Sequence, residues 1–120
     1  MTRWMTSAKQ REVEIEFLIS IVCEHFGVSN RALFAAGKPP ELIAARHVIR
    51  HMMRTQLGML HREIAAVFGQ DRSSAGHSYR KVKSLMEIEP ELRELIKKLS
   101  VKLTEFSDKL NHQAEIGVVA

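Results

Sequence analysis

The stretch that decides the fold is HREIAAVFGQDRSSAGHSYRKVK, residues 61–83, which contains two helical patterns separated by a glycine turn. Apolar residues recur at helical spacing over residues 61–68, and Gly69 stands where a glycine commonly ends a helix. A second helix is expected over about residues 73–87. A short helix, a tight turn and a longer helix form a helix-turn-helix, whose second helix lies in the major groove of DNA.

Positive charge is concentrated around this stretch. The 120 residues carry a formal charge of +4, but residues 46–83 contain eight basic and two acidic side chains, a net +6. Residues 1–45 are neutral on the same count, and residues 84–120 carry a net −2. A basic segment between neutral and acidic ones is typical of a surface that binds a polyanion. The alternative interpretation is a solvated helix face without a partner.

Helical spacing of apolar residues continues on both sides of the stretch, with glycine, proline or an N-cap serine at the boundaries. No alternation typical of β-strands is present. The sequence therefore predicts an all-α fold of five to six helices around the helix-turn-helix. The helices expected outside it cover residues 10–26, 30–36, 40–56 and 90–112.

Composition limits the class of protein. A chain that is 45% hydrophobic and 27% charged is typical of a globular domain, and no apolar stretch is long enough to cross a membrane. The single cysteine, Cys23, excludes an internal disulfide and favours a buried thiol in a reducing cytoplasm. His47 and His51 lie one helical turn apart, but no carboxylate or cysteine completes a metal site. We expect neither enzymatic activity nor a cofactor.

The start of the second helix carries the side chains expected to meet DNA. Arg72 can reach a guanine edge or a phosphate, and serine hydroxyls can bond base edges or phosphates. The small residues Ala75 and Gly76 are expected to lie on the surface that approaches DNA. Three basic residues follow within reach of backbone phosphates: Arg80, Lys81 and Lys83.

These residues carry a resemblance to a known family. The segments Glu63–Gly69 and Asp71–Ser74, followed by His77 and Arg80–Val82, resemble the C-terminal DNA-binding domain (domain IV) of the bacterial replication initiator DnaA. The resemblance covers about residues 15–103 and implies a fold like that of the Trp-repressor helix-turn-helix superfamily. The phosphate-binding motif G-x-x-x-x-G-K-[ST] is absent from the chain. We therefore expect a DNA-binding module without the ATPase domain and without a nucleotide cofactor.

The resemblance implies that double-stranded DNA is the partner and which residues contact it. Arg72 occupies the family's base-reading position, and Ser73 and Ser74 occupy the positions of two threonines. Contacts to the backbone or grooves are implied at the other matched positions, which are Lys38, Arg46, His47, His61, Arg62, Asp71, His77, Arg80 and Lys81.

The last predicted helix carries an apolar seam. Its residues are spaced alternately by four and three, as in a coiled coil: Leu92, Ile96, Leu99, Leu103, Phe106 and Leu110. Residues beyond 103 extend past the last helix of the resembling family. Two interpretations remain open. Either Leu99, Leu103, Phe106 and Leu110 form a homodimer interface, or the extension folds back on Phe17 and Ile21 of the same chain.

The predicted organisation is a flexible N-terminus (1–11), a DNA-binding domain (12–103), a helical extension (104–113) and a flexible tail (114–120). The function favoured is sequence-selective binding of double-stranded DNA by a small transcriptional regulator of a bacterium or phage, located in the cytoplasm with the nucleoid. One alternative is a replication-linked factor that occupies initiator-type sites. Another is a protein-interaction adaptor that has lost its contact with DNA.

Overall fold

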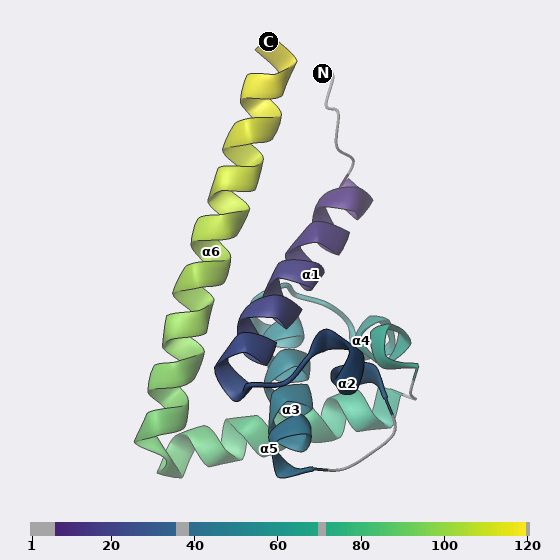
Figure 1. The fold of residues 1–120 in the computed structure, drawn as a ribbon, viewed down its shortest axis with the longest axis vertical. Coiled ribbons are helices and arrows are strands. Elements are labelled where there is room, and N and C mark those ends of the chain that lie inside the picture. Colours follow the sequence, from purple (N-terminus) through teal and green to yellow (C-terminus); the bar gives the residue numbers. More distant parts are fainter. Residues whose placement is uncertain (1–6, 36–38, 70–71, 120) are drawn as a thin grey trace.

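The computed structural model describes residues 7–35, 39–69 and 72–119, and the side chains of residues 8–35, 39–69 and 75–112. Within these ranges the predicted all-α fold is confirmed, and none of the helices is long and apolar enough to cross a membrane. The elements are α1 (Ser7–Phe26), α2 (Asn30–Phe34), α3 (Pro40–Thr55), α4 (His61–Phe68), α5 (Arg72–Ile88) and α6 (Pro90–Val119), as Figure 1 shows.

Local signals in the sequence set most helix boundaries. Gly27, Gly58 and Gly69 have positive φ angles of 67°, 63° and 66°, which a residue with a side chain rarely adopts. They follow or terminate α1, α3 and α4 at the predicted places. The N-cap role of Ser29 is also confirmed, because its hydroxyl accepts a 3.0 Å hydrogen bond from the backbone N–H of Ala32.

Three boundaries differ from the prediction. Helix α1 begins at Ser7, within the segment expected to be a flexible N-terminus. Helix α2 ends at Phe34, two residues early. The expected end of the last helix near His112 is wrong, since α6 continues to Val119 through most of the predicted tail. No proline interrupts the chain after Pro90, and the helix continues through Gly117.

The core is formed where α1, α3, α5 and α6 meet. Its predicted members on α3 are confirmed, because Ala45, Ile49, Met52 and Met53 are fully buried. Cys23 is buried as well, and this burial raises the pKa of its thiol. The thiol is therefore a small apolar core group rather than a nucleophile.

Helices α1 and α6 run antiparallel and extend together beyond the other helices (Figure 1). The rings of Phe17 and Phe106 are stacked with their centroids 4.1 Å apart and their planes 5° apart. Leu99, Leu103 and Leu110 are all buried. The apolar seam of α6 is thus covered by its own chain, including Phe17 as the fold-back interpretation expected.

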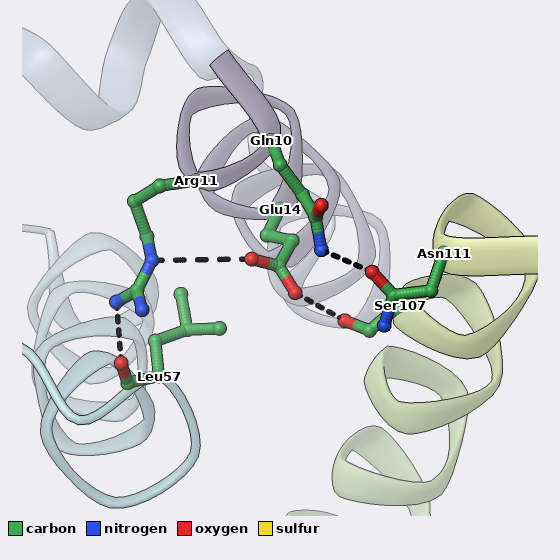
Figure 2. A network of polar contacts seen from close by, with 6 residues as sticks. All are labelled: Gln10, Arg11, Glu14, Leu57, Ser107 and Asn111. Atoms are coloured by element: carbon green, nitrogen blue, oxygen red, sulfur yellow. Dashed lines mark hydrogen bonds and ion pairs between the residues drawn. The ribbon is translucent and has the colours of Figure 1, made fainter. Parts of the chain in front are cut away.

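Polar contacts join the two helices beside this seam (Figure 2). Gln10 Nε2 donates a 2.6 Å hydrogen bond to Asn111 Oδ1, and Ser107 Oγ donates one of 2.5 Å to a carboxylate oxygen of Glu14. Arg11 lies 3.9 Å from the other Glu14 oxygen and also donates to the carbonyl of Leu57. These contacts determine the register of α6 on α1 and tie both helices to the loop after α3.

Candidate nucleic-acid interface

Helix α5 has two faces of different character. Ala75, Ser78 and Val82 are at most 2% exposed and face the core, where α5 packs against α3 and α4. His77 and Arg80 are exposed on the opposite face, as the helical repeat requires. Among the α5 side chains that the structure describes, residues 75–88, four basic ones are exposed: His77, Arg80, Lys81 and Lys83.

The predicted DNA-facing role of Ala75 is wrong, whereas that of Gly76 stays a prediction. Ala75 is 1% exposed and belongs to the core, and Gly76 is also buried. A Cβ added at Gly76 would lie 3.2 Å from the guanidinium of Arg80, one turn further along. Ala75 is a small residue where α5 packs in the core, whereas Gly76 is covered by the side chain of Arg80 on its own helix.

Ser78 is a polar centre in the buried face of α5. Its hydroxyl oxygen accepts a 3.1 Å hydrogen bond from Arg50 and lies 2.8 Å from Nδ1 of His47. A guanidinium can only donate, so the hydroxyl proton of Ser78 is free to be donated to the histidine. We therefore assign a neutral His47 whose ring proton is on Nε2. Burial, followed by the charges of Arg50, His77 and Lys81, lowers the pKa of His47, which agrees with a neutral ring.

Arg50 connects the two helices of the motif to α3. Its guanidinium lies over the ring of Phe68 at 4.6 Å from the centroid, within the range of a cation–π interaction. The same group donates to Ser78 on α5. Burial and the nearby Arg46 lower the pKa of Arg50, although a guanidinium remains charged at any physiological pH. This buried arginine, 7% exposed, holds α3, α4 and α5 together.

Two more arginines of α3 bind backbone carbonyls. Arg46 donates to the carbonyls of Leu33 at 2.9 Å and Ala35 at 2.8 Å, at the C-terminal end of α2. Arg54 donates at 3.0 Å to the carbonyl of Met59, in the loop before α4. All three arginines of α3 therefore make structural contacts, and the exposed basic surface is smaller than the net +6 of residues 46–83 indicated.

Helix α4 is capped at its start and ends at the predicted glycine. The backbone N–H of Leu60 donates a 2.7 Å hydrogen bond to the carboxylate of Glu63, which satisfies one N–H at the start of α4. Gly69, in the left-handed conformation, ends the helix. Arg62 is exposed on α4, whereas His61 is half-buried with its ring centroid 6.1 Å from that of Tyr79.

The predicted DNA-binding residues fall into three groups. Lys38 and Asp71 lie outside the described residues. Residues 72–74 form the first turn of α5, but the structure does not describe their side chains. The remaining predictions are placed, with Arg62, His77, Arg80 and Lys81 exposed and Arg46, His47 and His61 partly buried. Their contacts with DNA stay predictions.

Sequence reasoning missed Ser78 and the structural role of Arg50. A serine on the otherwise apolar face of a predicted helix, where α5 should meet the core, is the signal that could have revealed this polar centre. Basic residues recur on α3 every four positions, at Arg46, Arg50 and Arg54, which places them on one side of that helix. This spacing could have indicated that the three arginines contact neighbouring parts of the same chain.

Comparisons with known proteins agree with this geometry. The family described as the bacterial DnaA protein helix-turn-helix matches residues 15–82, more than half of the chain. The chain is similar to the chromosomal replication initiator protein DnaA of Thermomicrobium roseum, with 28% identity over 87 residues, 72% of this chain and 19% of that protein. The initiator of Mycoplasma genitalium is 26% identical over 84 residues, 70% of this chain and 19% of that protein. The chain thus spans about a fifth of the length of these relatives.

Proposed function

The chain belongs to the bacterial DnaA protein helix-turn-helix family, and from that premise we propose that it binds double-stranded DNA sequence-selectively, with α5 as the recognition helix. The observation that carries the proposal is the two-faced character of α5. Ser78 anchors the buried face to α3, while His77, Arg80 and Lys81 are exposed. A recognition helix needs both properties, because it must be held rigidly while it presents basic and polar groups to DNA.

The first turn of α5 supplies the proposed base contacts. A recognition helix presents its N-terminal residues to base edges in the major groove. Arg72 would then contact a guanine, and the hydroxyls of Ser73 and Ser74 would bond neighbouring base edges. Serine lacks the methyl group through which threonine contacts the methyl of thymine. We therefore expect this chain to prefer a DNA sequence different from that of family members with threonines.

Phosphate contacts supply most of the proposed affinity. Arg80 and Lys81 are exposed one to two turns further along α5, where they can reach the DNA backbone. Arg62 on α4 and, through Nε2–H, His47 on α3 add further donors. Lys38 and His61 complete the proposed backbone and groove contacts. Such contacts release counterions from DNA, so the affinity depends on salt concentration.

We propose that the protein is a small transcriptional regulator of a bacterium or phage that acts at the nucleoid. The two serines at the base-reading positions favour this over an initiator-type role, because they change the contact surface. A replication-linked factor is the second candidate, and the names of the relatives favour it, since each is a chromosomal replication initiator. The preferred DNA sequence distinguishes the two candidates.

Selection of bound sequences from a random duplex pool, followed by anisotropy titration of the selected duplex, tests the proposal. We expect one enriched motif and, if about four phosphates are contacted, a loss of affinity of roughly 100-fold between 50 and 200 mM salt. An enriched initiator-type motif would favour the replication-linked role. Absence of binding to any duplex at low salt would contradict the proposal and favour a protein-interaction adaptor.

A homodimer remains a separate prediction. The residues predicted to form it are covered within the chain, because Leu99, Leu103 and Leu110 are buried and Phe106 stacks on Phe17. A dimer through that seam therefore requires α6 to separate from α1. Light scattering at high micromolar concentration measures the mass, and a monomer would contradict the dimer.

A further inference from the structure

A cavity of about 380 Å³ lies behind the recognition helix, between the end of α1, the middle of α3, the second half of α5 and the start of α6. Its wall is apolar and formed by Phe26, Val48, Val82, Leu85, Leu92 and Leu95. Val48 and Val82 are buried, and the other four are half-buried. Cavities of 300–1,000 Å³ with apolar walls and a few polar groups are the usual form of small-molecule sites.

Lys81 and the two glutamates of the cavity are separated along its length, and His25 near the end of α1 also lines it. His47 and the exposed Lys81 lie at one end of the cavity. The charged side chains that act on His47 are all basic: Arg50, His77 and Lys81. Glu89 and Glu91 line the cavity at the junction of α5 and α6. Along α5, the distance from Lys81 to that junction is roughly 10 Å at 1.5 Å per residue. An anionic group is therefore stabilised at the Lys81 end and repelled at the glutamate end.

We infer that this cavity binds a small monocarboxylic acid with an apolar body, whose carboxylate pairs with Lys81 and whose body lies along Val82, Leu85 and Leu92. The distribution of charge defines the chemical class. A dicarboxylic acid of the same length would place its second carboxylate near Glu89 and Glu91. An amine would have to bind in the reverse orientation, with its ammonium group beside Glu89 and Glu91, so octylamine is the competitor that tests the assigned orientation.

The site also links the ligand to DNA, a consequence that depends on the proposed function. Lys81 lines the cavity and belongs to the exposed basic face of α5. A carboxylate paired with Lys81 competes with a phosphate for the same ammonium group. Ligand and DNA then weaken each other's binding by the same factor, as thermodynamic linkage requires.

Binding is tested without DNA by using 8-anilinonaphthalene-1-sulfonate, an apolar anion that fluoresces in apolar cavities, as the probe. The full-length protein is titrated with the dye, which is then displaced with octanoate, with the dicarboxylate suberate or with octylamine. We expect saturable binding of one dye molecule, displaced by octanoate at a concentration at least tenfold lower than by suberate or octylamine. Equal displacement by the three compounds would overturn the assignment.

Two variants and one control test whether octanoate and the dye bind in this cavity. Lys81→Gln should weaken octanoate binding roughly tenfold, the usual effect of removing one charge-assisted contact. Lys83→Gln is the matched control, because Lys83 is also exposed on α5 but does not line the cavity. Ala44→Phe places a ring in the cavity and should abolish dye binding. The proposal would be overturned if Lys81→Gln and Lys83→Gln bound octanoate with equal affinity. It would also be overturned if a folded Ala44→Phe protein still bound the dye.

The link to DNA has its own readout. Saturating octanoate should weaken binding of a selected duplex about tenfold in the unmodified protein and leave that of Lys81→Gln nearly unchanged. Octanoate that binds without changing DNA affinity would overturn the link but not the site. If the protein binds no duplex, the proposed function fails, and dye displacement still decides whether the cavity is a ligand site.

Discussion

Replacing Ser78 with alanine tests the buried polar centre that holds the recognition helix. Ser78 is 0% exposed, accepts a 3.1 Å hydrogen bond from Arg50 and lies 2.8 Å from Nδ1 of His47. Alanine removes both contacts and leaves the hydroxyl's two partners without it. The substitution therefore exposes the cost of unsatisfied polar groups rather than that of a lost packing contact.

The expected loss follows from these two contacts. A buried polar group that loses a contact costs roughly 1–3 kcal/mol, and here the buried Arg50 and the half-buried His47 each lose one. Arg50 keeps its contact with the ring of Phe68, which reduces the part of the free-energy cost that comes from Arg50. We expect the free energy of unfolding to fall by about 2–4 kcal/mol, a large part of the ~5–15 kcal/mol of a typical domain.

Urea denaturation followed by circular dichroism measures this loss. With an m-value of roughly 1–3 kcal/mol per molar urea, the midpoint should move down by about 1–2 M while the slope stays constant. Ser84→Ala is the matched control, because Ser84 is exposed on the same helix and should change stability by less than about 0.5 kcal/mol. Equal midpoints for the two variants would refute the idea that Ser78 holds α5 to α3.

Three further predictions concern pH, the α1–α6 contact and DNA specificity. Burial lowers the pKa of His47 and of His51, so the unfolded chain takes up protons first and stability should decrease as the pH falls below about 6.5. Urea midpoints between pH 5.5 and 7.5 check this, and a midpoint that rises on acidification would contradict it. Phe106→Ala removes the stacked ring and should cost about 1–3 kcal/mol. The exposed Val101→Ala is its control, and equal costs would show that the stacking adds no stability. Arg72→Ala should reduce the preference for the selected duplex over a scrambled one by about 1–3 kcal/mol in paired titrations, whereas an unchanged preference would exclude base reading by Arg72.

Short-range signals made the helices of this protein predictable. Glycines with positive φ, the Ser29 N-cap and the proline at the start of α3 and α6 act within one turn of the chain, so they are readable without tertiary context. The same holds for the apolar periodicity of α3, whose predicted inward residues are fully buried. The end of α6 was not predictable in this way, because its backbone continues through Gly117, the one glycine in this helix.

It was harder to predict which basic side chains are exposed and which bind other parts of the protein. The +6 of residues 46–83 indicated a basic surface, but charge counting cannot distinguish a solvated arginine from one bound to carbonyls or an aromatic ring. Arg46, Arg50 and Arg54 each bind a different neighbouring element. Their partners lie 5 to 28 positions away in the chain, among them Met59 and Ser78. The basic residues at positions 77 to 83 of α5 are exposed, and the location of the interface stays a prediction.

The sequence by itself determined the helices, their order and the helix-turn-helix, because these depend on residues within a few positions of one another. Only the tertiary structure decided which groups are left for a partner. It buried Ala75, assigned the arginines of α3 to structural contacts and covered the seam of α6 with α1. The physical reason is competition: an apolar stripe or a guanidinium binds whichever complementary surface is nearest after folding, and that surface comes from distant parts of the chain.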